Sequence, residues 1–261
     1  MTAALNSGPA VAERCRQALL APTDRAEIID VLRVEEMRKH VLADRTPIAA
    51  GNPGDDVGSW AERSAVLMPF GRILYRIARS LGGPIVEVGT GSGVSTAYLA
   101  AGSARTGGGP MVTLELDPTL AERAQYRLSE SNFTEVTVRQ GKQSDNAPDL
   151  LTQIQPVLVH LDSDHRHDST FAFLDSVAAA GPGPTVVCLD DIRWSPEMEE
   201  VWAGLLRGDH GATHAFDLDL WGVVVLSASS PDPCLHEDLV PPRGLSSATI
   251  RGESQTRGPV S

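Results

Sequence analysis

Five short apolar segments, separated by stretches of helical periodicity, constrain the fold of this chain more than any other feature of its sequence. They are rich in β-branched residues and apolar at both odd and even positions, which is typical of parallel strands covered on both faces. The segments are residues 85–88, 111–116, 136–138, 157–161 and 185–189. Alternation of such strands with helices predicts a doubly wound, Rossmann-like α/β domain.

Two further strands are predicted at the end of this domain, near residues 213–217 and 221–227. Only Leu218, Asp219 and Leu220 separate them. Because a crossover between parallel strands needs about a dozen residues or more, these two strands must pair antiparallel as a hairpin. The predicted sheet therefore departs from a plain parallel Rossmann sheet.

Helices precede the predicted sheet, and an irregular segment follows it. Apolar positions at helical spacing in residues 11–43, interrupted by Pro22, predict two helices, and the same pattern predicts one helix over residues 60–81. The last part of the chain is rich in Pro, Ser and Gly and is expected to be mobile. We therefore divide the chain into N-terminal helices with a lid or loop (1–59), one α/β domain (60–228) and a tail (229–261).

Composition narrows the function classes. A length of 261 residues suits one α/β domain with extensions. A formal net charge of -12 would repel a phosphate backbone, so we expect a small-molecule partner and no nucleic acid. The chain has no apolar run long enough to span a bilayer and no signal-peptide pattern, which predicts a cytoplasmic protein without a membrane partner. Cys15, Cys188 and Cys234 fit neither a disulfide framework nor a zinc site and are expected to be buried or incidental thiols.

A glycine-rich loop, Glu87-Val-Gly-Thr-Gly-Ser-Gly93, follows the first predicted strand and opens the helix that contains Ser95. Glycines allow a sharp turn and a close approach to a ligand, and the helix start supplies free N–H groups. The glycine spacing differs from the dinucleotide pattern Gly-x-Gly-x-x-Gly. Glu87 would repel a pyrophosphate but suits the ammonium of a methionine moiety, so a nicotinamide cofactor is disfavoured. A turn without a ligand is the structural alternative.

Glu115 ends the second predicted strand, 22 residues after Gly93. A carboxylate at this place can accept hydrogen bonds from both hydroxyls of a ribose. The alternative is a solvated acid at a strand end.

Together, Ile85-Val-Glu-Val-Gly-Thr-Gly-Ser-Gly-Val-Ser-Thr96 and Val112-Thr-Leu-Glu-Leu-Asp-Pro118 resemble the first two motifs of class I S-adenosylmethionine (SAM) dependent methyltransferases. The resemblance covers about residues 60–228. It implies a seven-stranded sheet in the order 3-2-1-4-5-7-6 with the seventh strand antiparallel, in agreement with the predicted hairpin. It also implies that residues 141–145 form a loop near the adenine. The cofactor-binding residues implied are Glu87, Gly89, Gly91, Gly93, Ser95, Glu115, Gln143, Ser144 and Asp162.

Acidic residues follow the fourth and fifth predicted strands: Asp162 after the fourth, and Asp190 and Asp191 after the fifth. In the implied sheet these strands are neighbours, so the three carboxylates should meet at one edge. Crowded carboxylates repel one another unless a cation neutralises them, and oxygen ligands without cysteine favour Mg²⁺. The alternative is that these three carboxylates bind no metal ion.

The acidic pattern is similar to that of the divalent-metal-dependent O-methyltransferases of the catechol and caffeoyl-CoA type, except that Asp191 stands where those enzymes have asparagine. Asp162-Ser-Asp-His165 is instead similar to a bacterial branch that includes macrolide-sugar O-methyltransferases. That resemblance implies that His165 is the catalytic base, a role that suits histidine near neutral pH.

These features predict a SAM-dependent, divalent-metal-assisted O-methyltransferase that acts on a hydroxyl of a small metabolite. The resemblance alone suggests bacterial secondary metabolism. Trp60 and Trp194 are candidates for the lid and the pocket wall, although a core position is the simpler prediction for Trp194. The alternatives are a metal-independent N- or O-methyltransferase and a SAM-binding protein without turnover. The sequence leaves open the acceptor and whether the chain forms a homo-oligomer.

Overall fold

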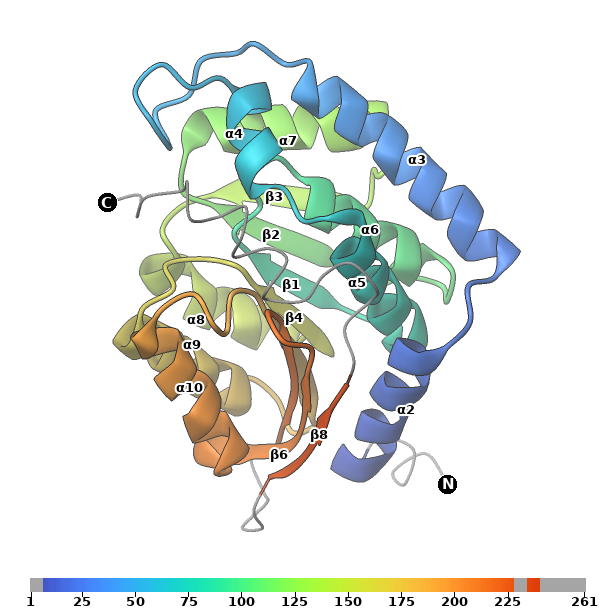
Figure 1. Ribbon diagram of the computed structural model, residues 1–261, viewed down its shortest axis with the longest axis vertical. Coiled ribbons are helices and arrows are strands. Elements are labelled where there is room, and N and C mark those ends of the chain that lie inside the picture. The colour runs from blue at the N-terminus through green and yellow to red at the C-terminus, as the bar shows by residue number, and fades with distance from the viewer. Residues whose placement is uncertain (1–6, 228–233, 240–261) are drawn as a thin grey trace.

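A computed structural model of the protein describes residues 7–227 and 234–239. Its centre is an eight-stranded sheet in the order β3-β2-β1-β4-β5-β7-β6-β8 (Figure 1). The strands are β1 Ile85–Val88, β2 Met111–Glu115, β3 Val136–Gln140, β4 Leu158–Leu161, β5 Thr185–Leu189, β6 Ala212–Asp217, β7 Gly222–Leu226 and β8 Leu235–Asp238. β1 to β5 are parallel, and β7 is antiparallel to both β5 and β6. The doubly wound fold, the order of the first seven strands and the hairpin are confirmed.

The sheet has one strand more than the seven that the sequence predicts. β8 lies inside the segment 229–261 that was expected to be a mobile tail, and it extends the sheet by pairing parallel to β6, with His214 opposite Leu235. Its sequence, Leu-His-Glu-Asp, has no apolar pattern. None is needed, since β8 lies at the sheet edge and most of its side chains are exposed. Backbone pairing to β6 and an ion pair between Arg16 and Glu237 hold this edge strand, and neither leaves a periodic apolar pattern in the sequence. Residues 229–233 and 240–261 of the predicted tail lie outside the described residues.

Helices flank the sheet: α2 Gly8–Leu20, α3 Arg25–Leu42, α4 Val57–Ser64, α5 Met68–Leu81, α6 Val94–Ala104, α7 Pro118–Glu130, α8 Gln143–Ile154, α9 His167–Ala179 and α10 Pro196–Leu206. The single helix predicted over 60–81 is wrong, since α4 and α5 divide it. Pro69 lies in the first turn of α5, where its missing N–H costs nothing, whereas it would interrupt a continuous helix. Among the described residues, no helix is both long and apolar enough to cross a membrane.

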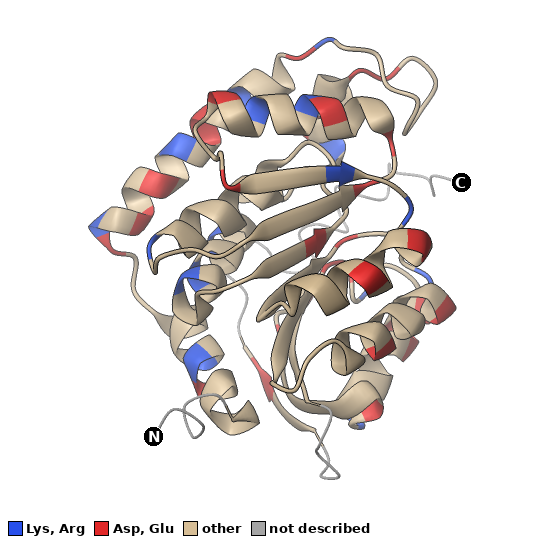
Figure 2. Cartoon of the chain, turned by 180° about the vertical axis from the view of Figure 1, so that it is seen from behind, with Lys and Arg blue, Asp and Glu red and all other residues tan. Residues whose placement is uncertain are grey.

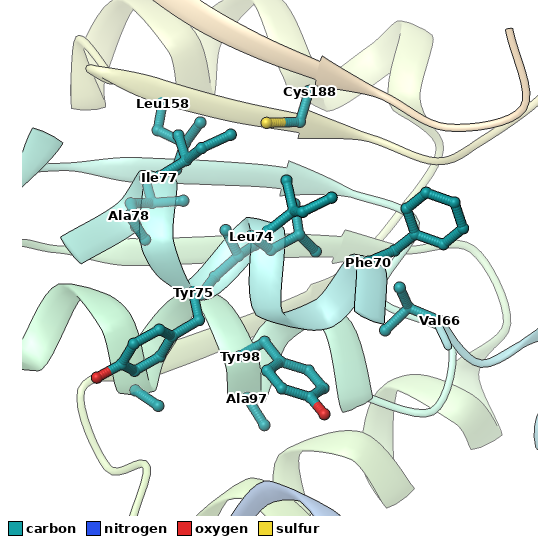
Figure 3. Close-up of a cluster of buried hydrophobic side chains, with 14 of the residues drawn as sticks. Val66, Phe70, Leu74, Tyr75, Ile77, Ala78, Ala97, Tyr98, Leu158 and Cys188 are labelled. Atoms are coloured by element: carbon teal, nitrogen blue, oxygen red, sulfur yellow. The ribbon is translucent and has the colours of Figure 1, made fainter. Parts of the chain in front are cut away.

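The core has two halves, one on each face of the sheet. Helices α2 to α7 contribute to one half, and α8, α9 and α10 to the other. Alternate strand residues face opposite halves: Cys188 packs on the α5 side, whereas Val187 and Leu189 pack on the far side. Figure 3 shows Leu74 and Ile77 of α5 near Leu158 and Cys188 of the sheet. Burial of both faces explains why the strands are apolar at every position.

Ion pairs attach the N-terminal helix α3 to the domain. Figure 2 shows charged residues mainly on the helices and loops around the sheet. Glu27, buried on α3, pairs with Arg72 and Arg76 of α5, with Nε–Oε distances of 2.7 and 2.9 Å. Just after α3, Asp44 pairs with Arg123 of α7 at 2.6 Å. The α3 segment is therefore part of the same packed unit as the sheet.

Replacing Asp44 with asparagine is expected to lower the free energy of unfolding by about 2 kcal/mol at pH 7. Burial acts to raise the pKa of Asp44, but hydrogen bonds from Thr46 and Arg123 outweigh it and lower the pKa to about 2. The stabilisation is thus fully present above about pH 5, where the unfolded carboxyl is ionised, and is lost as the pH falls towards 2. Urea unfolding at several pH values should show the difference between wild type and variant shrinking from pH 5 to pH 3. A difference that does not change with pH would contradict this assignment.

Candidate active site

The glycine loop, residues 89–93, connects β1 to α6 and requires glycine at three positions. Gly89, Gly91 and Gly93 have φ angles of +97°, +51° and +82°. A Cβ atom on Gly89 would lie 1.9 Å from the carbonyl oxygen of Asp162, and one on Gly91 would lie 2.5 Å from Cη2 of Trp60. The loop therefore touches both the segment after β4 and the indole of α4, and its glycines are needed for these contacts.

Glu115, at the end of β2, holds the glycine loop through its carboxylate. One oxygen accepts a hydrogen bond from the N–H of Gly91 at 2.7 Å, and the other accepts from the N–H of Asp117 at 2.9 Å. Burial raises the pKa of Glu115. The structure thus places Glu115, the residue predicted to bind the ribose, directly at the loop.

Glu87 lies inside the core beside the glycine loop. Its side chain is fully buried, and its carboxylate accepts hydrogen bonds from the hydroxyls of Thr96 and Thr113 and from Nδ1 of His160. These donors enclose the carboxylate, so direct contact with a cofactor ammonium stays a prediction. Ser95, in the first turn of α6, is also buried.

The three predicted metal ligands meet at the carboxyl ends of β4 and β5. Backbone hydrogen bonds hold two of them at the ends of the strands. The N–H of Asp162 donates to the carbonyl of Val88 at 2.9 Å, and the N–H of Asp190 donates to the carbonyl of Leu161 at 3.0 Å. Burial raises the pKa of Asp162, Asp190 and Asp191, and repulsion from neighbouring carboxylates adds to the effect. The sheet order therefore brings Asp162 close to Asp190 and Asp191, which lie 28 and 29 residues further along the sequence.

His165 lies between two of these acids. Its Nε2 atom is 3.6 Å from Oδ1 of Asp162 and 3.8 Å from Oδ2 of Asp191. The atom is buried and has no hydrogen-bond partner among the residues that the structure describes. A buried ring nitrogen flanked by carboxylates is available to take up a proton, and the carboxylates would stabilise the resulting imidazolium.

Backbone strain gathers at the same place. Asp164, His165 and Asp191 have φ angles of +59°, +40° and +55°. Residues other than glycine rarely adopt such angles. Each one costs of order 1–3 kcal/mol, and it persists only where the surrounding structure imposes it. Strained residues of this kind cluster at functional sites, and no sequence pattern revealed them here.

The remaining predicted residues, Gln143, Ser144 and Trp194, lie in different surroundings. Gln143 begins α8 and accepts a hydrogen bond from the hydroxyl of Ser163 at 2.6 Å, which brings it to the segment after β4. Ser144 is exposed and bonds its neighbour Asp145. The predicted loop 141–145 is thus partly the first turn of a helix. Trp194 is 53% exposed, so the prediction of a core position for it is wrong.

The structure also shows polar residues that the sequence reasoning did not use. Thr113 and His160 lie in the middle of buried strands, and both are fully buried beside Glu87. A polar residue inside an otherwise apolar strand was the signal that could have identified them, because buried polar groups need partners.

Residues 86–192 match the family model described as a methyltransferase domain. The match and the shared fold together support a class I SAM-dependent methyltransferase domain over this part of the chain. The match runs from β1 to the residue after Asp191, so it includes the glycine loop, Glu115, His165 and the acidic cluster. A protein of Mycolicibacterium smegmatis that is provisionally named an O-methyltransferase is 31% identical over 138 residues. This alignment covers 50% of the chain and 60% of the length of that relative.

Solved structures share the fold of the methyltransferase domain. An O-methyltransferase from Bacillus cereus, in complex with S-adenosylhomocysteine (SAH), superposes with a TM-score of 0.56 at 21% identity, covering 80% of this chain and 94% of that one. The O-methyltransferase TomG from Streptomyces achromogenes, in complex with SAM, gives 0.51 at 19% identity, covering 81% and 93%. At these identities the comparison establishes the fold.

In this domain, Glu115→Ala is expected to weaken SAM binding by roughly 1.5–3 kcal/mol, the range for hydrogen bonds to a charged group. The variant also frees the N–H of Gly91, so the loop itself should loosen. Isothermal titration calorimetry with SAH, which avoids turnover, measures the change. An unchanged affinity in a folded variant would remove Glu115 from the cofactor site.

Proposed function

We propose that the protein transfers the methyl group of SAM to a hydroxyl oxygen of a small molecule, with His165 as the base. One observation carries the proposal: the unpartnered Nε2 of His165 lies between Asp162 and Asp191. Asp162 in turn contacts the glycine loop, because its carbonyl oxygen occupies the space beside Gly89. The proposed base and the proposed cofactor loop are therefore adjacent.

The cofactor would lie along the glycine loop. Gly89, Gly91 and Gly93 would allow the cofactor to approach the backbone closely. The N–H groups at the start of α6, near Ser95, would face the carboxylate of its methionine part, and Glu115 would accept hydrogen bonds from its ribose hydroxyls. Gln143, Ser144 and Asp162 would border the adenine and the methionine part, and Glu87 would act on either the ammonium or the loop.

The chain's own residues would handle the proton. His165 removes it from the acceptor hydroxyl, and the carboxylates of Asp162 and Asp191 stabilise the imidazolium that forms. The oxygen then bonds to the methyl carbon while the carbon–sulfur bond breaks, and SAH leaves.

We extend the proposal to a divalent cation, held by Asp162, Asp190 and Asp191. Their oxygen atoms are the donors that Mg²⁺ prefers, and the three carboxylates meet at the carboxyl ends of β4 and β5. A bound ion would supply positive charge that lowers the pKa of the acceptor hydroxyl. Within residues 7–227 and 234–239, however, no group of three or more His, Cys, Asp or Glu side chains is arranged to hold a metal ion.

A metal-independent reaction is the second candidate, and the position of His165 favours it. In that reaction, the imidazolium that His165 forms when it takes the acceptor's proton would balance the charges of Asp162 and Asp191. The two candidates share the same fold, cofactor and base. They differ only in which positive charge balances the negative charge of the three carboxylates.

Methyl transfer should be measured by mass spectrometry with SAM and a panel of small hydroxylated and amino compounds. Natural products belong in the panel, because TomG takes part in tomaymycin synthesis. We expect O-methylated products. Products methylated only on nitrogen would overturn the choice of acceptor, and SAH binding without turnover on any compound would favour a binding protein.

Removal of divalent metal with EDTA is expected to reduce the rate, and added Mg²⁺ should restore it. Asp190→Asn should abolish this response while leaving SAH affinity near wild type, since the ion would contact the acceptor rather than the cofactor. Asp164→Asn, an exposed acid on the same segment, is the control and should keep the metal response. Full activity of the metal-free protein would reject the cation and leave the metal-independent reaction.

A further inference from the structure

A row of buried polar side chains crosses the sheet beside the glycine loop. Thr113 of β2, Glu87 of β1 and His160 of β4 occupy matching positions on three adjacent strands. All three are fully buried. The Glu87 carboxylate lies at the centre and carries no partner with a permanent positive charge in this row, so neutral donors must stabilise it.

The carboxylate sets the direction of every hydrogen bond in this row. Ionised Glu87 can only accept, so the hydroxyl of Thr113 donates to it at 2.7 Å. The oxygen of Thr113, 2.6 Å from that of Thr90, must then accept from the Thr90 hydroxyl. Thr90 lies between Gly89 and Gly91 in the loop, and Thr96, a second donor to Glu87, lies in the first turn of α6. Glu87 is thereby connected to both ends of the loop.

His160 completes the set of donors. Its Nδ1 is 3.0 Å from Oε1 of Glu87, and its ring stacks on Trp221, with 5.4 Å between centroids. Its Nε2 is buried and has no hydrogen-bond partner within residues 7–227 and 234–239. A proton on Nε2 would be an unsatisfied buried donor, so the neutral ring carries its proton on Nδ1 and donates to Glu87.

We propose that His160 is a positioning residue for the cofactor loop and acts through Glu87. By holding one oxygen of the carboxylate, it orients the other towards Thr113 and Thr96, which fixes Thr90 and the start of α6. The role of Glu87 is therefore to hold the loop in its binding conformation, and direct contact with the cofactor is unnecessary. This inference rests on the proposed function only in that the loop binds SAM.

The test compares three variants of the full chain. His160→Leu removes the donor, whereas His160→Asn keeps an N–H donor close to the position of Nδ1. Cys188→Ala is the matched control, because Cys188 lies opposite His160 in the pairing of β4 with β5 and is not one of the donors to Glu87. Cys188 packs in the apolar cluster on the α5 side of the sheet (Figure 3). Hydrogen exchange of the amides of residues 89–93 is measured without ligand, and SAH affinity is measured by calorimetry.

His160→Leu is expected to speed exchange in the loop and to weaken SAH binding by about tenfold, since it removes a hydrogen bond to a charged group. His160→Asn should restore much of both, and Cys188→Ala should lower the melting temperature while leaving both unchanged. Equal effects of His160→Leu and Cys188→Ala would overturn the proposal, because they would indicate general loss of packing. Wild type that binds no SAH would reject the proposed function, while the exchange data would still decide the role of His160.

Two further measurements apply if His160→Leu does not fold. Thr113→Val is nearly isosteric, breaks the connection from Glu87 to Thr90, and should loosen the loop in the same way. Nitrogen-15 NMR of the wild-type imidazole should show the proton on Nδ1. A proton on Nε2, or normal loop protection in Thr113→Val, would overturn the proposal.

Discussion

Replacing His165 with glutamine is expected to slow methyl transfer by about 10²- to 10⁴-fold, the usual contribution of a general base. SAH affinity should stay near wild type, because the glycine loop and Glu115 do not depend on the imidazole. Single-turnover kinetics with saturating SAM measures the chemical step directly. His167→Gln is the matched control: this histidine lies two residues away, bonds Asp168 at 2.9 Å, and should keep nearly the full rate.

Other outcomes would reassign the proton transfer. A rate near wild type in His165→Gln would show that the proton leaves by another route, with Asp164 or His167 as the next candidates. Parallel loss of metal response and rate would make His165 a support of the acidic cluster. Equal slowing in His165→Gln and His167→Gln would point to a distorted loop instead of a lost base.

Gly89→Ala is expected to destabilise the protein by about 4 kcal/mol and to abolish SAH binding. A positive φ costs an alanine roughly 1–3 kcal/mol, and an inserted methyl in a packed place costs a similar amount. The new Cβ would lie 1.9 Å from the carbonyl oxygen of Asp162, so the segments after β1 and β4 would have to separate. Urea unfolding and calorimetry with SAH measure the two effects.

Two glycines separate the causes of this loss. Gly54 has a φ of +88° but open space around it, so Gly54→Ala reports the backbone cost alone. Gly183 has open space and no positive φ, so Gly183→Ala should be nearly neutral. If Gly89→Ala lost no more stability than Gly54→Ala, the close contact between the loop and Asp162 would not be required.

The sequence predicted the parts of the fold that depend on local pattern. Apolar residues at every position of β5 indicated a strand buried on both faces, and three residues between β6 and β7 left room only for a hairpin. By contrast, periodicity continued through residues 65–67 and hid the break between α4 and α5, and it gave no sign of the edge strand β8.

The candidate site divides in the same way. Residue types and spacing by themselves determined which loop could bind a cofactor and which acids end the strands, because glycines with positive φ and carboxylates at strand ends are local properties. Only the tertiary structure decided that His165 lies between Asp162 and Asp191, that Asp164 and Asp191 are strained, and that Glu87 faces Thr113 and His160. These facts depend on the register of strands distant in sequence and on side-chain packing, and no local pattern encodes either of them.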